Sequence, residues 1–271
     1  MTSKFRFRLH LVDKELPSHY YAQTALVDLD NDGQLEYIVG QQYGDIFWYK
    51  AEDPKRWQRH LLGEDSPSDV GGIALDVDGD GWIDFVAGGA WYRNSRDLDK
   101  PWTRIVFDGA LTGVHDVKVA DVDGDGALEI LTMSDQNSAR WYEIPGDPAE
   151  PWTPHEIGPP VHAGLSTGDI NGNGYLDVVR TDIWFENVNG DGLTWRQHPI
   201  GPNTPPPPDF QPPFAFDATY SVVCDMNGSG KNDIVFTDAE IPGGRIWWME
   251  NIDGTGQAWR RHDVYDWHPA K

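Results

Sequence analysis

Short runs of β-branched and aromatic residues alternate with polar turn residues along most of the chain. Residues 25–27 and 37–39 form one pair of such apolar runs, and residues 117–119 and 130–131 form another. Runs this short, bounded by turn residues, predict β-strands rather than helices. The 29 glycines and 20 prolines support this, because both residues favour turns over long helices. The pattern predicts an all-β protein.

A nine-residue acidic loop separates the two runs of each pair and occurs five times. The first copy, residues 28–36, reads Asp-Leu-Asp-Asn-Asp-Gly-Gln-Leu-Glu, and the others span residues 76–84, 121–129, 169–177 and 225–233. Successive copies start 48, 45, 48 and 56 residues apart. A fivefold repeat at nearly constant spacing indicates a repeat architecture.

The loop has the ligand chemistry of a calcium site. Oxygen-bearing side chains occupy its positions 1, 3 and 5, a glycine at position 6 allows a sharp turn, and position 9 carries a carboxylate. Hard oxygen ligands of this kind suit Ca²⁺. The flanking strands, and the lack of a Glu at position 12, distinguish the loop from an EF-hand.

The predicted metal ligands are the side chains at positions 1, 3, 5 and 9. They are Asp28, Asp30, Asp32, Glu36, Asp76, Asp78, Asp80, Asp84, Asp121, Asp123, Asp125, Glu129, Asp169, Asn171, Asn173, Asp177, Asp225, Asn227, Ser229 and Asp233. Asn or Ser replaces Asp in the last two copies, so we expect up to five calcium ions with weaker binding there. The alternative for each copy is a polar turn that binds no metal. This alternative is strongest for the fourth and fifth copies.

Each acidic loop is followed by an aromatic pair and then by an outer strand that usually reads Trp-x-x-His. The pairs are Trp48-Tyr49, Trp91-Tyr92, Trp141-Tyr142, Trp184-Phe185 and Trp247-Trp248. The histidines of these outer strands are His60, His155, His198 and His262, and their regular placement predicts a structural role. The unit therefore reads as four antiparallel strands, which is the content of one propeller blade.

Five loops predict a five-bladed β-propeller in one domain over residues 1–271. The blades are expected at about 20–63, 70–108, 115–158, 162–201 and 217–265. Residues 5–12 alternate like a further strand, which we expect to close the ring against the last blade. Residues 201–216, a Pro-rich stretch that contains three Phe, lengthen the interval between the fourth and fifth acidic loops. This stretch has three alternative interpretations: a lid, a subunit contact or a loop without function.

The acidic loops, followed by Trp-Tyr-x-Asn at residues 91–94 and Trp-Phe-x-Asn at residues 184–187, resemble the FG-GAP/VCBS class of calcium-binding propeller repeats. The resemblance extends over residues 20–265. Within this class, the Trp-x-x-His strands look most like the propeller of aldos-2-ulose dehydratase-like sugar lyases. The class also includes integrin α-chain heads, some lectins and several polysaccharide-acting enzymes, so the resemblance implies a fold rather than one function.

If the first strand of each blade is innermost, the acidic loops share one rim and the more varied loops surround the opposite mouth of the channel. Varied loops on a repeated scaffold are where ligands bind. The candidate catalytic residues at this mouth are His115, His162, Glu240 and Asp116, and the candidate substrate-binding residues are His19, Tyr21, Arg180, Asp182 and Asp135.

His115 and His162 occupy nearly equivalent places in adjacent predicted blades. With Asp116 or Glu240 they are suited to hold a second divalent metal, or to act as a base and acid pair. The alternative is that each histidine merely bonds the backbone of a neighbouring blade.

Three functions fit this arrangement. A carbon–oxygen lyase or dehydratase acting on a neutral keto- or anhydro-sugar would need proton abstraction beside a carbonyl, with the histidines as base or metal ligands. A lectin-like module or a protein-interaction propeller would need no catalytic group. The diversity of the mouth loops favours one asymmetric site, and therefore an enzyme with a carbohydrate ligand.

Charge and composition limit the partners. The 44 acidic and 21 basic side chains give a net charge of −23, which disfavours nucleic acid and anionic membranes. No run approaches the roughly 18 apolar residues of a membrane span. The first residues lack the apolar core of a signal peptide, so we expect a cytoplasmic protein if this N-terminus is native, or a secreted or periplasmic one if a signal has been removed.

Overall fold

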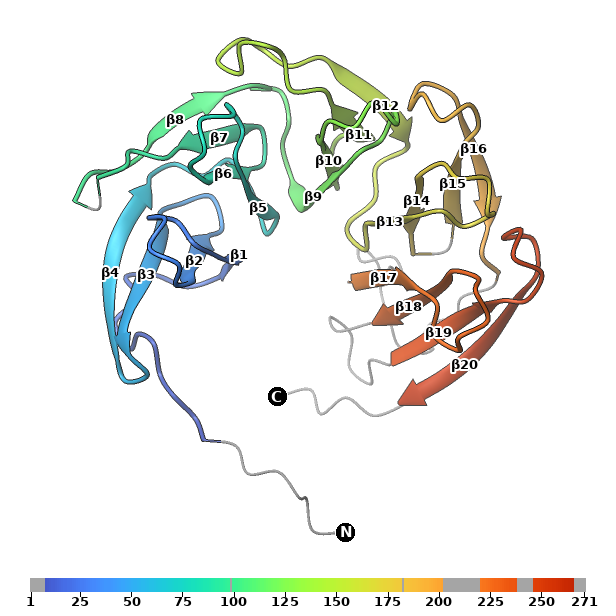
Figure 1. Ribbon diagram of the computed structural model, residues 1–271, viewed down its shortest axis with the longest axis horizontal. Helices are drawn as coiled ribbons and strands as arrows, with labels where there is room; N and C mark the ends of the chain where they lie inside the picture. The colour runs from blue at the N-terminus through green and yellow to red at the C-terminus, as the bar shows by residue number, and fades with distance from the viewer. Residues whose placement is uncertain (1–7, 98, 182, 202–219, 238–245, 266–271) are drawn as a thin grey trace. The chain divides into compact units, whose positions relative to one another are not determined.

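The computed structural model describes residues 8–97, 99–181, 183–201, 220–237 and 246–265, and it contains five separate β-sheets (Figure 1). Each sheet has four strands that follow one another in chain order, and all neighbouring strands are antiparallel. The described residues contain no helix, and hence none long and apolar enough to cross a membrane. The all-β prediction and the prediction of five four-stranded units are confirmed.

The sheets group into two compact units, Met1–Val106 and Phe107–Lys271. In the first unit, the first sheet comprises β1 (Tyr21–Val27), β2 (Glu36–Gln41), β3 (Ile46–Asp53) and β4 (Arg56–Gly63), and the second comprises β5 (Gly72–Leu75), β6 (Asp84–Ala87), β7 (Ala90–Arg93) and β8 (Thr103–Val106).

The second unit holds three sheets. The third comprises β9 (Val114–Ala120), β10 (Glu129–Ser134), β11 (Ala139–Tyr142) and β12 (Pro154–Gly158). The fourth comprises β13 (Ser166–Gly168), β14 (Asp177–Arg180), β15 (Ile183–Asn187) and β16 (Trp195–Pro199). The fifth comprises β17 (Tyr220–Cys224), β18 (Asp233–Thr237), β19 (Ile246–Asn251) and β20 (Trp259–Tyr265).

Burial differs between the second and the fourth strand of a sheet. Every residue of β6 and of β10 is buried, as expected for strands covered on both faces. In contrast, β8 and β16 contain no buried residue and carry charged side chains. The second strand therefore lies within the core, and the fourth strand forms a solvent-exposed edge.

The apolar core lies between neighbouring sheets of the same unit. In the first unit Trp48 of the first sheet clusters with Phe85 of the second. In the second unit one cluster joins the third and fourth sheets around Trp141, and another joins the fourth and fifth around Trp184. The aromatic residues of the third strands therefore supply the packing between sheets.

The histidines of the Trp-x-x-His strands stack on tryptophans of the preceding strand. The stacks are Trp48–His60, Trp141–His155, Trp184–His198 and Trp248–His262, with ring centroids 4.2–4.4 Å apart. The last stack changes the predicted alignment of the repeats, because Trp248 rather than Trp247 takes the place of Trp184. The pairing of Trp248 with His262 across β19 and β20 fixes this register.

An asparagine three residues after the stacked or equivalent tryptophan links neighbouring sheets. The Nδ2 groups of Asn94, Asn187 and Asn251 donate to the backbone carbonyl at position 2 of the preceding acidic loop, at 2.8–3.0 Å. Their backbone N–H groups donate to the position-9 carboxylate of their own loop, at 2.8–3.0 Å. Each of these asparagines therefore connects two acidic loops; Ala51 and Ile144 stand at the same place in the first and third sheets.

Residues 8–12 form no strand, which differs from the closing strand predicted over residues 5–12; residues 5–7 lie outside the described part of the chain. The chain is anchored just beyond, where Asp13 accepts hydrogen bonds from the Tyr49 hydroxyl and from Arg59 Nη1, each at 2.9 Å. Side-chain contacts with the first sheet, rather than strand pairing, hold this segment. The Pro-rich insertion lies outside the described residues from position 202 on.

Candidate functional site

All five acidic loops share one backbone design. The glycine at position 6 has a φ angle between +82° and +91° in every loop, a region that suits glycine because it has no Cβ. The N–H of this glycine donates to the position-1 Asp at 2.7–3.2 Å. The N–H at position 2 donates to the position-9 carboxylate at 2.6–3.1 Å. These bonds curl each loop around its own oxygen atoms.

Carboxylates converge in the first three loops. The groups are Asp28, Asp30 and Asp32, then Asp76, Asp78 and Asp84, then Asp121, Asp123 and Glu129, and within each group the ligand atoms lie within 4.8 Å of one another. The Oε1 atom of Glu36 is buried without a hydrogen-bond partner among the described residues. Because a buried, unpartnered carboxylate oxygen is costly, this donor set fits a hard divalent cation such as Ca²⁺.

The fourth and fifth loops lack such a group among the described residues. Their side-chain oxygens are engaged locally, since Asn171 Oδ1 accepts from the N–H of Asn173 at 3.1 Å and Asn227 Oδ1 from that of Ser229 at 3.0 Å. The same bond occurs in the second and third loops, where Asp78 and Asp123 accept from the N–H at position 5 at 3.3 and 3.2 Å, so the four loops share this turn. Weaker metal binding in the fourth and fifth loops stays a prediction.

Burial controls the ionisation of the position-9 carboxylates. Together with neighbouring acidic groups, it raises the pKa of Asp84, of Glu129 and of Asp177 to about 7. Without a cation these groups are therefore partly protonated at neutral pH. A bound cation would favour the charged form, so metal binding and proton release are coupled in these loops.

One position in or directly after the third strand, two residues after the stacked or equivalent tryptophan, differs in charge from sheet to sheet. The repeat pattern described above did not include this position. Lys50 forms ion pairs with Asp30 and Asp32 of the first loop. Arg93 pairs with the position-3 carboxylate of the second loop at 2.6 Å. The third sheet has Glu143 at this place, and no Lys or Arg pairs with the third loop in the described part of the chain. A comparison of the five repeats at this position would have revealed the difference.

His115 and His162 lie side by side at the other end of the sheets of the second unit. Their ring centroids are 4.3 Å apart. His115 is buried in β9, at the point where the pairing register between β9 and β10 shifts. Such irregularities redirect side chains and occur near functional sites. The expected proximity of the two histidines is therefore present in the structure.

Asp135 and Asp116 have different relationships to this pair. His162 Nδ1 lies 2.7 Å from Asp135 Oδ1, and a carboxylate in this position favours the tautomer that donates from Nδ1. Asp116 Oδ2 accepts hydrogen bonds from the backbone N–H groups of Gly164 and Leu165, at 2.8 and 3.1 Å. Asp116 therefore fixes the segment that follows His162.

The remaining candidates belong to different parts of the chain. Arg180 lies in the same unit, with Nη1 3.5 Å and 3.4 Å from the carbonyl oxygens of Pro159 and Pro160. His19 and Tyr21 belong to the first unit. Asp182 and Glu240 lie outside the described residues. Their predicted roles stay predictions.

Comparison with known proteins supports the repeat assignment. A family model described as FG-GAP-like repeat matches residues 76–132 and 121–179. Aldos-2-ulose dehydratase from Phanerodontia chrysosporium is 30% identical over 145 residues, which make up 42% of this chain and 16% of that protein. The chain thus matches only a small part of this relative.

Two solved structures show more distant similarity. The V. cholerae biofilm matrix protein Bap1 has a TM-score of 0.49 at 16% identity, over 89% of this chain and 39% of that one. The rhamnogalacturonan lyase YesW has a TM-score of 0.46 at 13% identity, over 92% of this chain and 51% of that one. Residues 76–179 therefore contain FG-GAP-like repeats, and the first and fifth acidic loops have the same sequence pattern.

Proposed function

We propose that this chain is a calcium-stabilised five-bladed β-propeller that acts on a carbohydrate, as a lyase or dehydratase on a neutral keto- or anhydro-sugar. Three observations support the proposal. The chain has five sheets of blade size, its carboxylate loops suit calcium, and its 30% identical relative carries the name of a sugar dehydratase. The observation that carries the catalytic part is the contact between His115 and His162.

His162 is the proposed general base. Asp135, at 2.7 Å, favours the tautomer with its proton on Nδ1, and in this proposal Nε2 takes the substrate proton. Such a base would remove a proton from the carbon beside the sugar carbonyl, and the carbon–oxygen bond at the next carbon would then break. His115, whose ring centroid is 4.3 Å from that of His162, is the proposed acid that returns a proton to the departing oxygen.

Acid–base chemistry is favoured over a second metal at this place. A metal held by the two histidines would need Asp116 or Glu240 as a further ligand. The Oδ2 atom of Asp116 already accepts two backbone hydrogen bonds, and Glu240 lies outside the described residues. In the described residues, groups of three or more His, Cys, Asp or Glu ligands occur only in the acidic loops. Asp116 is therefore a positioning residue in this proposal, and Arg180 is the proposed contact for sugar oxygens.

An activity screen tests the proposal. The calcium-loaded protein is incubated with neutral keto-sugars and anhydro-sugars, and the near-ultraviolet absorbance of an enone product is followed. His162→Ala should reduce kcat/KM by at least about a hundredfold, which is the usual contribution of a general base. Asp135→Asn should have a smaller effect, and the exposed His10→Ala serves as the control. No turnover of any substrate by the unaltered protein, or full activity of His162→Ala, would contradict the catalytic assignment.

A further inference from the structure

Three turns of equal length connect the third and fourth strands of the second, fourth and fifth sheets. They run from Asn94 to Trp102, from residue 187 to residue 195, and from residue 251 to residue 259. The last two contain glycine at their fourth and sixth residues, whereas the first has Asp97 and Asp99 there. The turns therefore differ in sequence while their ends are the same.

The glycine turns cover a tryptophan of the preceding sheet. In the fourth sheet, the carbonyl of Gly192 accepts hydrogen bonds from the indole N–H groups of Trp141 and Trp195, both at 2.8 Å. In the fifth sheet, the carbonyl of Gly256 does the same for Trp184 and Trp259, at 3.1 and 2.9 Å. Each glycine carbonyl thus serves two indoles at once.

Only glycine can occupy this covering position. A Cβ atom on Gly192 would lie 2.8 Å from Cζ2 of Trp141, and one on Gly256 would lie 2.6 Å from Cζ2 of Trp184. Asn187 Oδ1 accepts a hydrogen bond from the N–H of Gly192 at 3.1 Å and so holds the turn down. The φ angle of Gly192, +66°, also suits glycine.

The turn of the second sheet leaves its tryptophan uncovered by such a carbonyl. Asp99 stands where the covering glycine would be, and Asn94 Oδ1 accepts instead from the N–H of Arg96, at 2.8 Å. Arg96 takes a φ angle of +56° and places its guanidinium 6.0 Å from the centre of the Trp82 ring. In the described part of the chain, Trp48 and Trp102 have no acceptor equivalent to the Gly192 carbonyl.

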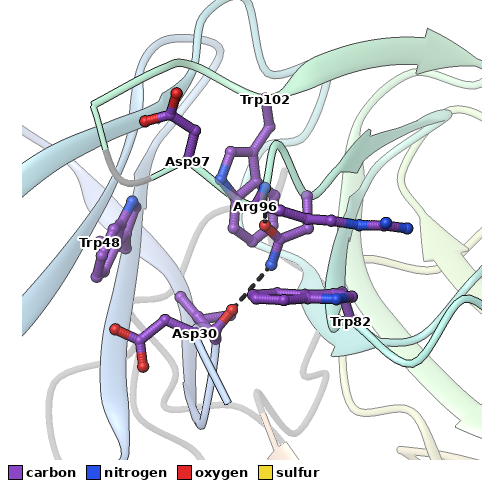
Figure 2. Close-up of a pocket in the computed structure, with 8 residues that line it drawn as sticks. Asp30, Trp48, Trp82, Arg96, Asp97 and Trp102 are labelled. Atoms are coloured by element: carbon purple, nitrogen blue, oxygen red, sulfur yellow. Dashed lines mark hydrogen bonds between the residues drawn. The ribbon is translucent and has the colours of Figure 1, made fainter. Parts of the chain in front are cut away.

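A cavity of about 260 Å³ lies at this place in the first unit. Three tryptophans line it, together with Asp30, Arg96 and Asp97. Figure 2 shows Trp48, Trp82 and Trp102 around one space, with Asp30 and Asp97 at its margin. Pockets for drug-sized ligands are mostly larger than this, so the cavity suits a ligand of about one ring.

We propose that this cavity, lined by Asp30, Trp48, Trp82, Arg96, Asp97 and Trp102, binds one neutral sugar ring. An oxygen of the sugar takes the place of the missing glycine carbonyl and accepts hydrogen bonds from the Trp48 and Trp102 indoles. Asp97, which forms an ion pair with Lys100 at 2.6 Å, accepts a hydrogen bond from a sugar hydroxyl, and Trp82 packs against the apolar face of the ring.

The chemistry of the lining favours a sugar over an organic cation. Two indole N–H groups and the guanidinium of Arg96, which forms an ion pair with Asp80, are donors, and a cation cannot accept hydrogen bonds from them. A polyhydroxylated ring offers acceptors to these donors, a hydroxyl proton to the Asp97 carboxylate and an apolar face to an indole. This site lies at the acidic-loop end of its sheets and does not depend on His162, so it would bind sugar without acting on it.

Binding of methyl glycosides tests the proposal. The glucoside, galactoside, mannoside and N-acetylglucosaminide are titrated into the full chain by calorimetry and by saturation-transfer NMR. Trp82→Ala should weaken binding about tenfold, because an aromatic contact of this kind is worth about 1 kcal/mol or more. Tyr175→Ala, at the same place in the fourth acidic loop, is the matched control and should bind as the unaltered protein does.

A turn graft gives the sharper test. Residues 95–101 are replaced by the sequence of residues 188–194, Val-Asn-Gly-Asp-Gly-Leu-Thr, which should cover Trp48 and abolish binding without lowering the melting temperature. If the grafted protein does not fold, glycoside binding by Trp82→Ala tests the proposal instead. His162→Ala should leave glycoside binding unchanged. Failure of the proposed catalytic role of His162 is therefore distinguishable from failure of the proposed sugar-binding cavity. The proposal is overturned if no glycoside binds, if Trp82→Ala or the folded graft binds normally, or if tetramethylammonium binds in place of the glycosides.

Discussion

The first and third acidic loops carry the same ligand residues in different surroundings. Both have Asp at positions 1, 3 and 5 and Glu at position 9. Lys50 forms ion pairs with two carboxylates of the first loop, whereas the equivalent residue of the third sheet is Glu143. The ammonium of Lys50 must be displaced before a cation can use those oxygens. The nine-residue motif alone therefore does not set metal affinity, and the third loop is expected to bind calcium more tightly than the first.

Removing calcium should have the largest effect. A site filled at a hundredfold excess over its dissociation constant contributes about 2.7 kcal/mol to the free energy of unfolding, so excess chelator should lower the melting temperature clearly. The decrease should be smaller for Asp123→Asn, which lacks the third-loop site, than for Asp30→Asn. Melting curves followed by circular dichroism measure this, and an unchanged melt in excess chelator would count against calcium binding altogether.

Neutralising one carboxylate should have opposite effects in the two loops without metal. Asp30→Asn removes a partner of Lys50 and should destabilise the protein, by up to about 1 kcal/mol for this partly exposed pair. Asp123→Asn relieves repulsion among carboxylates that no Lys or Arg of the described residues offsets, and should stabilise the protein by a similar amount. Urea denaturation in chelator measures both variants. Effects of the same sign would remove the proposed difference between the loops.

Exchanging the charge beside each loop should shift calcium affinity. Lys50→Gln should strengthen binding in the first loop about tenfold, since it removes a competing cation, and Glu143→Lys should weaken the third loop. Isothermal titration calorimetry with calcium measures both. Lys55→Gln, an exposed lysine of the same sheet, is the control and should change nothing.

Acidification should give the smallest effect and a defined sign. Burial raises the pKa of Glu129 to about 7 in the metal-free protein, so calcium must displace a proton at lower pH. Third-loop affinity should fall about threefold from pH 7.5 to 6.5, as expected for one group with this pKa. Because the folded pKa exceeds the usual value, the metal-free protein should lose stability as the pH rises towards 7. A calcium affinity independent of pH would contradict this coupling.

The repeated loops and strands could be predicted from the sequence. Features that depend on contacts between residues distant in the sequence could not. The five loops, their strands and the neighbouring positions of His115 and His162 follow from local pattern and period. The stacking of Trp248 rather than Trp247 depends on strand register, which the pair of adjacent tryptophans left ambiguous. Alternation alone predicted a strand over residues 5–12, although Leu9 and Leu11 have no strand to pair with in the described part and remain exposed.

The cavity beside Trp48 has a signal in the sequence outside the acidic loops. Asn and Trp stand eight residues apart in the second, fourth and fifth sheets, and glycine is missing between them only in the second. The spacing showed that the turns are equivalent. The sequence did not predict that a turn without glycine leaves a cavity beside the tryptophan. This depends on the position of Gly192, where a Cβ would collide with the Trp141 indole.

The hydrogen bonds of the asparagines that connect acidic loops affect the cooperativity of unfolding. Asn94 ties the second sheet to the first, and Asn187 and Asn251 tie the fourth to the third and the fifth to the fourth. Ile144, in the first sheet of the second unit, has no side-chain donor for such a bond. In repeat proteins, cooperativity comes from nearest-neighbour coupling. Loss of structure in one acidic loop should therefore spread to the loop that its asparagine contacts, and each asparagine→alanine variant should broaden the melting transition measured by calorimetry.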